Sequence, residues 1–157
     1  MATTGSSTLT SGGSDNSAWI EELSLVTQLD LTGSKSYSLQ GDPQTVTQSG
    51  PISDDAWMYQ DSSGGPYWFV SEGTSFAGYE LRHGTASLGS GAQAEGYADL
   101  SDGSRGLTVA IRHFWENFPN KLNVSPDGTV SVLPMPRDFS EAIEHRSGER
   151  KTHWTLF

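Results

Sequence analysis

Hydrophobic and polar residues alternate along several stretches of this chain, with the two-residue period that is typical of β-strands. Residues 23–31 carry leucine or threonine at every odd position. Residues 107–114 also alternate, and they place Val109, Ile111 and His113 on one face, because successive side chains of a strand point to opposite sides. The pattern predicts strands that bury one face, with Arg112 and His113 directed to opposite sides.

Turn-forming residues separate the clearest of these patterns. An Asp-Gly pair at 102–103 follows the strand predicted at 97–100, and Pro-Asp-Gly at 126–128 joins strands predicted at 122–124 and 129–133. Proline presets φ, aspartate bonds nearby backbone, and glycine accepts a positive φ. Two successive hairpins therefore predict an antiparallel β core.

Weaker patterns complete the expected fold. They predict strands at 37–39, 45–48, 76–82 and 153–157, and a hairpin formed by 56–60 and 67–70. The Gly/Ala/Ser-rich residues 85–95 predict a long loop, a common position for function in a β scaffold. Residues 139–145 fit either one or two helical turns or an extended linker. The sequence thus predicts an all-β, antiparallel β-sandwich with long Gly/Ser-rich loops and at most one short helix.

The pattern also predicts how the chain is divided. Residues 1–18 are rich in serine, threonine and glycine and lack a strand period, which predicts a flexible tail. Residues 19–157 are then the β-sandwich domain, a length that suits one domain. The apolar strand predicted at the last residues suggests a sandwich truncated at its C-terminal edge.

Composition and charge narrow the function classes. Glycine (18 residues) and proline (7) are frequent, which fits a turn-rich β fold. The formal net charge of −10 argues against nucleic acid as a partner, because polyphosphates require a surplus of lysine and arginine. No apolar run is long enough to span a membrane, and the absence of cysteine excludes disulfides and thiolate metal sites.

Three segments carry a resemblance to a known family: GYADLSDG at 96–103, GLTVAIRHFWENFPNKLNV at 106–124 and GERKTH at 148–153. They resemble the central β-sandwich domain of the exo-rhamnogalacturonan lyase (YetA-like) family. The strong match covers about a third of the chain, and His113 stands where the family pattern has an acidic residue. In that family a large helical toroid follows the sandwich. The resemblance therefore implies a fragment of a larger, extracellular polysaccharide lyase that degrades pectic rhamnogalacturonan by β-elimination.

Elimination beside a uronate carboxylate needs positive charge to offset the carboxylate and a base for the proton. The residues that the resemblance offers as catalytic candidates are Arg112, His113, Arg150, Lys151 and His153. Each also has a structural interpretation: Arg112 as an ion-pair partner, His113 as a half-buried histidine, and the basic residues 145–153 as a contact to a neighbouring domain. We expect this domain to be structural or substrate-supporting rather than catalytic alone.

Aromatic residues offer a second interpretation. Trp57, Tyr67 and Trp68 flank a glycine-rich segment, where exposed flat rings would stack on sugars, although aromatics in small β domains are usually part of the core. A non-catalytic carbohydrate-binding or adhesion sandwich is therefore the alternative function. A self-associating fragment is a third, since unpaired sheet edges invite pairing. The expected partners are polysaccharide, neighbouring lyase domains or a second copy.

Metal binding has little support in the sequence. The carboxylates Asp54, Asp55, Asp61, Asp99 and Asp102 are scattered and lack the spacing of a calcium loop. No metal site is predicted, although the lyase chemistry leaves a calcium requirement open.

Overall fold

The computed structural model describes residues 2–10, 17–64, 75–146 and 150–157. Its regular elements are strands, and no helix occurs among these residues. The strands are β1 (Ala2–Thr10), β2 (Ser17–Gln28), β3 (Ser36–Gln40), β4 (Gln48–Pro51), β5 (Ala56–Gln60), β6 (Tyr79–His83), β7 (Ala86–Gly91), β8 (Tyr97–Ser101), β9 (Gly106–Ile111), β10 (Asn120–Val124), β11 (Thr129–Met135), β12 (Ile143–Arg146) and β13 (Thr155–Leu156).

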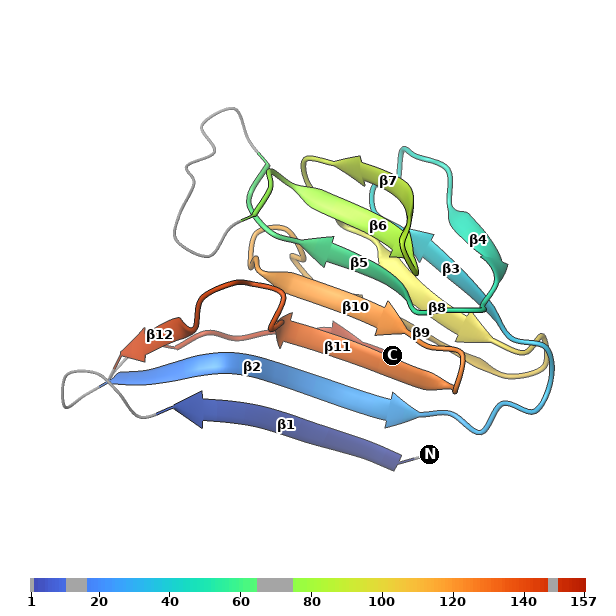
Figure 1. The fold of residues 1–157 in the computed structure, drawn as a ribbon, viewed down its shortest axis with the longest axis horizontal. Coiled ribbons are helices and arrows are strands. Elements are labelled where there is room, and N and C mark those ends of the chain that lie inside the picture. The colour runs from blue at the N-terminus through green and yellow to red at the C-terminus, as the bar shows by residue number, and fades with distance from the viewer. Residues whose placement is uncertain (1, 11–16, 65–74, 147–149) are drawn as a thin grey trace.

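Two antiparallel sheets form the sandwich, as predicted (Figure 1). The larger sheet has the order β1-β2-β11-β10-β5-β6-β7, with β12 also paired to β2. The smaller sheet has the order β13-β9-β8-β3-β4. β5, β10 and β11 of the larger sheet lie in front of β3, β8 and β9 in the view of Figure 1.

The core lies between the two sheets and is built by the predicted alternation. Inward-facing residues of the larger sheet include Met58, Leu122, Val124, Val130 and Val132, all fully or almost fully buried. They pack against residues of β3, β8 and β9 in the smaller sheet: Tyr37, Leu39, Ala98, Leu100, Val109 and Ile111. Burial of this apolar area is the main contribution to the stability of the fold.

Both predicted hairpins are present. β8 pairs with β9 from Ala98↔Val109 to Ser101↔Gly106, and β10 pairs with β11 from Lys121↔Leu133 to Val124↔Val130. In the first turn the Asp102 carboxylate accepts hydrogen bonds from the backbone amides of Ser104 and Arg105. The bond from the Arg105 amide, then those from the hydroxyl and amide of Ser104, and to a lesser extent one from the Gly33 amide, hold the pKa of Asp102 well below its usual range. Asp102 therefore also ties the hairpin to the turn before β3.

The N-terminal residues differ from the prediction of a flexible tail over 1–18. Residues 2–10 form β1, which pairs with β2 from Ala2↔Gln28 to Thr10↔Trp19, and residues 17–18 already belong to β2. A long neighbouring strand supplies backbone partners for a segment whose own composition has little strand preference.

Other segments have mixed outcomes. Residues 86–91, expected in a long loop, form β7 by pairing with β6. Of the two alternatives left open for 139–145, the extended one agrees with the structure over 143–145, because Ile143–Arg146 is strand β12. β5 pairs with β6, whereas the predicted partner segment 67–70 lies outside the described residues. β12 depends on pairing with the distant strand β2, whereas β7 forms a tight hairpin with β6, with only Gly84 and Thr85 between the two strands.

Candidate functional site

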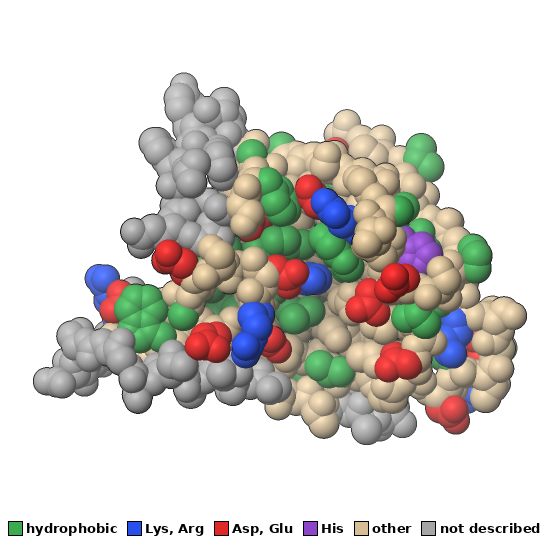
Figure 2. Space-filling view, viewed as in Figure 1, with side chains coloured by type: hydrophobic (Ala, Val, Ile, Leu, Met, Phe, Trp, Pro, Cys, Tyr) green, Lys and Arg blue, Asp and Glu red, His purple; other side chains and the backbone are tan. Residues whose placement is uncertain are grey.

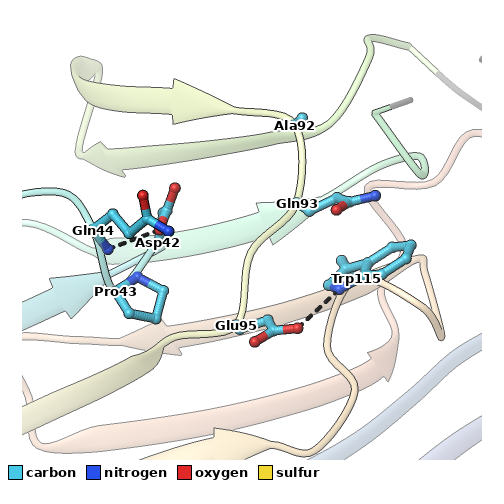
Figure 3. A pocket seen from close by; sticks show the side chains of 7 residues that line it. All are labelled: Asp42, Pro43, Gln44, Ala92, Gln93, Glu95 and Trp115. Atoms are coloured by element: carbon cyan, nitrogen blue, oxygen red, sulfur yellow. Dashed lines mark hydrogen bonds between the residues drawn. The ribbon is translucent and has the colours of Figure 1, made fainter. Parts of the chain in front are cut away.

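Three connections meet at one end of the sandwich and line an open surface cavity of about 340 Å³ (Figure 3). They are the β3–β4 connection, the β7–β8 connection and the turn between β9 and β10. The cavity is lined by two carboxylates, two carboxamides, one indole and two small apolar residues: Asp42, Glu95, Gln44, Gln93, Trp115, Pro43 and Ala92.

Trp115 forms one wall of this cavity. Its half-buried indole donates a hydrogen bond from Nε1 to Oε1 of Glu95 over 3.1 Å. The preceding residue, Phe114, is fully buried, and Asn120 Nδ2 donates to its carbonyl oxygen over 2.7 Å. The turn that carries Trp115 is therefore anchored at two points. Phe114 and Asn120 fix its backbone to the core, and Glu95 fixes the indole.

A compact turn forms the opposite rim. Oδ1 of Asp42 accepts a hydrogen bond from the backbone amide of Gln44 over 2.8 Å. The carbonyl oxygen of Asp42 accepts from the amide and the hydroxyl of Thr45 at 2.9 and 2.8 Å. These local bonds stabilise the turn and leave the Gln44 carboxamide at the cavity.

The third wall is held by a buried glutamine. The side chain of Gln60 donates to the carbonyl oxygen of Ala92 over 2.8 Å and accepts from the amide of Ala94 over 2.9 Å. The amide of Glu95 donates to the carbonyl oxygen of Gly41 over 2.8 Å, which joins two of the walls. Gln60 is fully buried, so the backbone beneath Gln93 and Glu95 is well anchored.

A buried tyrosine supports the cavity from below. Any Cβ at Gly41 or Gly91 would collide with the Tyr79 ring, so these glycines let the backbone pass close to it. Burial, and to a lesser extent the charge of Asp42, raises the pKa of Tyr79. Tyr79 therefore remains a neutral support for the cavity.

The lining determines which ligands suit this cavity. Carboxylates accept hydrogen bonds, carboxamides both donate and accept, and the indole offers a flat apolar surface with a polar edge. No lysine or arginine is among the described residues that line it. Such a site suits an uncharged molecule with several hydroxyl groups and one apolar face.

Arg112 and His113 lie beside this cavity. They line a neighbouring cavity of about 370 Å³ together with Glu95, Glu116 and Leu156, so Glu95 belongs to both cavities. The prediction that the two basic residues face opposite ways is wrong, because β9 ends at Ile111 and His113 has a φ of +56°. The His113 side chain is 53% exposed, and Nδ1 lies 3.1 Å from Glu116 Oε1.

The aromatic candidates lie elsewhere. Trp57 is half-buried on the outer face of the larger sheet, where charged and hydrophobic side chains are interspersed (Figure 2). Lys121 Nζ lies 4.7 Å from the centre of its ring, and the Arg82 guanidinium lies 5.8 Å away. Both cations are thus within cation–π distance of the Trp57 ring. Lys121 is also paired with Asp138 over 2.6 Å. Tyr67 and Trp68 lie outside the described residues.

The remaining basic candidates lie on the segment that connects β12 of the larger sheet with β13 of the smaller one. Arg150 is exposed, whereas Lys151 and His153 are half-buried. Burial lowers the pKa of Lys151, and burial together with the charge of Lys151 lowers the pKa of His153 to about 4. The catalytic candidates therefore divide between this segment and the end of β9.

The residues of the Trp115 cavity were largely missed by sequence reasoning. Asp42, Gln44 and Gln93 lie in connections without periodicity, and Trp115 was one of several aromatics with no distinguishing pattern. One signal was available. The segment 85–95 was expected to be functional, and its last residues contribute Gln93 and Glu95 to the cavity.

Among the described residues, no three His, Asp or Glu side chains lie close enough together to hold a metal ion. The same part of the chain has no helix that could cross a bilayer. No known protein family, curated protein or solved structure matches this chain.

Proposed function

We propose that this chain is a carbohydrate-binding β-sandwich module, and that the Trp115 cavity holds one glycosyl residue of a polysaccharide. One observation carries the proposal: an anchored indole and four carboxylate or carboxamide side chains face the same cavity. A sugar ring has one apolar face for the indole and hydroxyl groups for the polar side chains.

The cavity favours an uncharged glycosyl residue over a uronate. Asp42 and Glu95 are acidic, no basic residue of the described chain lines the cavity, and the net charge of −10 repels polyanions at long range. This supports the binding interpretation over cleavage next to a uronate. The segments that resemble the lyase sandwich remain the basis for proposing plant cell-wall polysaccharide as the source of the ligand.

Affinity electrophoresis in gels that contain one polysaccharide each tests this proposal. Galactan and arabinan serve as uncharged ligands, and polygalacturonate and rhamnogalacturonan as anionic ones. We expect retardation by an uncharged polysaccharide, and Trp115→Ala should weaken it about 5- to 30-fold, because the stacking area of the ring is lost.

Trp154→Ala is the matched control, since this tryptophan is 63% exposed and does not line the cavity. It should leave the retardation unchanged. Equal retardation of the wild-type protein and Trp115→Ala would refute the assignment of the cavity. An increase in the ultraviolet absorbance of unsaturated uronate with rhamnogalacturonan, abolished in Arg112→Ala, would instead show a lyase.

A second candidate function has its own observation. Trp154, Leu156 and Phe157 are 63%, 60% and 61% exposed, and they lie on or beside β13 at the edge of the smaller sheet. Three exposed apolar side chains at a sheet edge suit a contact with another domain or a second copy. This supports the role of a structural module in a larger lyase.

Analytical ultracentrifugation tests this second role for self-contact. Association that increases with concentration and is lost in a Trp154→Ser/Leu156→Ser double variant would support an interface at β13. A monomer at all concentrations, with no change in the double variant, would contradict self-association through this edge.

A further inference from the structure

A third cavity, at a different place in the chain from the Trp115 site, has an unusual charge distribution. It has a volume of about 340 Å³ and lies between the end of β11, β12 and the segment that follows β12. Its lining consists of two apolar residues, three basic residues and one acidic residue: Met135, Ile143, His145, Arg150, Lys151 and Glu144. Basic residues gather here although the chain as a whole carries a net charge of −10.

Lys151 is the least satisfied cation of this cavity. Its ammonium group has three donors, yet its hydrogen bond to a described residue is a long one, 3.4 Å to the carbonyl oxygen of Phe118. Among the described residues, no carboxylate lies within ion-pair distance of it. Burial lowers the pKa of Lys151, as expected for an ammonium group that loses water without gaining an anion.

The acidic residue of the lining is already paired. Glu144 Oε2 accepts hydrogen bonds from Nε and Nη2 of Arg146 at 3.0 and 2.8 Å. Hydrogen bonding to Arg146 is the main cause that lowers the pKa of Glu144. Glu144 is thus a carboxylate that stays ionised beside Arg146. Glu144 therefore does not serve as the counter-ion of Lys151, which has no carboxylate partner among the described residues.

His153, two residues after Lys151, also has unsatisfied polar atoms, although it does not itself line the cavity. Neither ring nitrogen of His153 has a hydrogen-bond partner among the described residues, although both atoms are buried. The charge of Lys151 contributes to lowering the His153 pKa, so the two basic side chains interact. Buried polar atoms without partners are uncommon. The lowered pKa leaves His153 uncharged at neutral pH, so Lys151 is the half-buried cation that has no carboxylate partner among the described residues.

We infer that this cavity is a binding site for a small oxyanion-bearing ligand, with Lys151 as the principal cation and Arg150 and His145 at its rim. A carboxylate or sulfate oxygen near Lys151 would supply the missing acceptor, and charge-assisted hydrogen bonds are the stronger class. The apolar side chains of Met135 and Ile143 would contact the body of an organic ligand such as a sugar acid.

Methyl and imidazole NMR spectra of the full chain test this inference. The probes are sodium glucuronate, glucose and sodium sulfate, each added at constant ionic strength with sodium chloride. We expect glucuronate to shift the Met135 and Ile143 methyl signals and the His153 ring signals with a saturable dependence, and a Kd on the order of 1–10 mM for one ion-paired contact. Glucose, which lacks the carboxylate, should cause no such shift.

Sulfate separates the two sources of the oxyanion. Shifts by sulfate at the same signals, in competition with glucuronate, would assign the site to oxyanions in general. Shifts by glucuronate without competition from sulfate would assign it to sugar acids. The absence of saturable shifts with both probes would overturn the inference in the wild-type protein itself, whether or not any variant folds.

Two variants localise the effect. Lys151→Met keeps the length of the side chain without its charge and should weaken binding about 10- to 100-fold, the range of a charge-assisted hydrogen bond. Lys35→Met, at a lysine that does not line the cavity, is the matched control and should bind like the wild type. Equal affinity of Lys151→Met and the wild type would refute the role of Lys151. Trp115→Ala should bind the oxyanion normally, which separates this site from the proposed glycosyl site.

Discussion

The indole of Trp115 and the carboxylate of Glu95 are joined by a hydrogen bond of 3.1 Å that connects the turn after β9 with the segment before β8. Glu95 also lines the cavity that contains Arg112 and His113. Glu95 therefore orients the indole of the Trp115 cavity and also lines the neighbouring cavity. It is the point at which the proposed glycosyl site is most easily tested.

Removal of this contact should release the indole. In Glu95→Ala the Trp115 Nε1–H signal should move toward the position of a water-exposed indole, and affinity for an uncharged polysaccharide should fall about 2- to 10-fold. Glu95→Gln should retain more affinity, because the carboxamide oxygen still accepts a hydrogen bond. The indole signal is read by ¹H–¹⁵N NMR. The same signal position in Glu95→Ala and the wild type would contradict the role of Glu95.

Alkaline pH should destabilise the protein through Tyr59. The Tyr59 hydroxyl donates to Oδ1 of the fully buried Asp61 over 2.5 Å. Burial, followed by this hydrogen bond and the Asp61 charge, raises the pKa of Tyr59 far above its usual value. An acid whose pKa is raised on folding stabilises the fold below the unfolded-state pKa, and this contribution is lost as pH rises above about 10.

Urea denaturation between neutral and alkaline pH measures this effect. Tyr59→Phe should flatten the loss of unfolding free energy above about pH 10, and should cost about 1–3 kcal/mol at neutral pH because Asp61 loses a donor. Tyr97→Phe, at a half-buried tyrosine of β8, is the control. A pH dependence identical in the wild type and Tyr59→Phe would show that other groups cause the alkaline loss.

Acidic pH should also destabilise the protein, in this case through His153. Burial and the charge of Lys151 lower the His153 pKa to about 4. The unfolded chain therefore binds a proton at higher pH than the folded chain does. The contribution of His153 is present above the unfolded-state value of about 6.5 and is lost as pH falls toward 4.

An NMR titration of the His153 ring measures its pKa directly. Lys151→Met should raise this pKa, because one cause of its depression is removed. His153→Leu should flatten the acid loss of stability, because the titrating group is absent. An unchanged His153 pKa in Lys151→Met would show that the two side chains do not interact.

The backbone at Gly96 passes close to the backbone of Gln40, and this packing can be tested. A Cβ at Gly96 would collide with the carbonyl oxygen of Gln40, which belongs to a neighbouring strand. Gly96→Ala should therefore destabilise the protein by about 3 kcal/mol or more, measured by thermal or urea denaturation. Gly89→Ala is the matched control, since a Cβ there meets nothing within 4 Å. Equal stability of the two variants would contradict this packing.

The parts of the fold that could be predicted are those that local chemistry decides. The β8–β9 and β10–β11 hairpins follow from strand alternation and Asp-Gly turns that are close in sequence. β1, β7 and β12 could not be predicted, because their strand structure depends on pairing with β2 or β6 rather than on their own residues. The resemblance to the lyase sandwich, and the function that it implies, remain predictions.

The candidate site was hidden for the same reason. Asp42, Gln93 and Trp115 are brought together by three connections from different parts of the chain, and no spacing in the sequence indicates that they meet. For His113 the alternation of side chains along a strand predicted the wrong direction. Its positive φ at the end of β9 turns it away from the row that the two-residue period assigned to it.

The excursion between β11 and β12 has a consequence for engineering. Both strands pair antiparallel with β2, β11 down to Met135↔Leu23 and β12 from Ile143↔Ile20 onward, so they follow the same side of one strand. The residues between them leave the sheet and return without changing its order. A peptide tag or a fluorescent reporter is therefore best inserted after Asp138, because β2 pairs with both flanking strands while Arg137 and Asp138 keep their ion pairs with Glu21, Glu22 and Lys121.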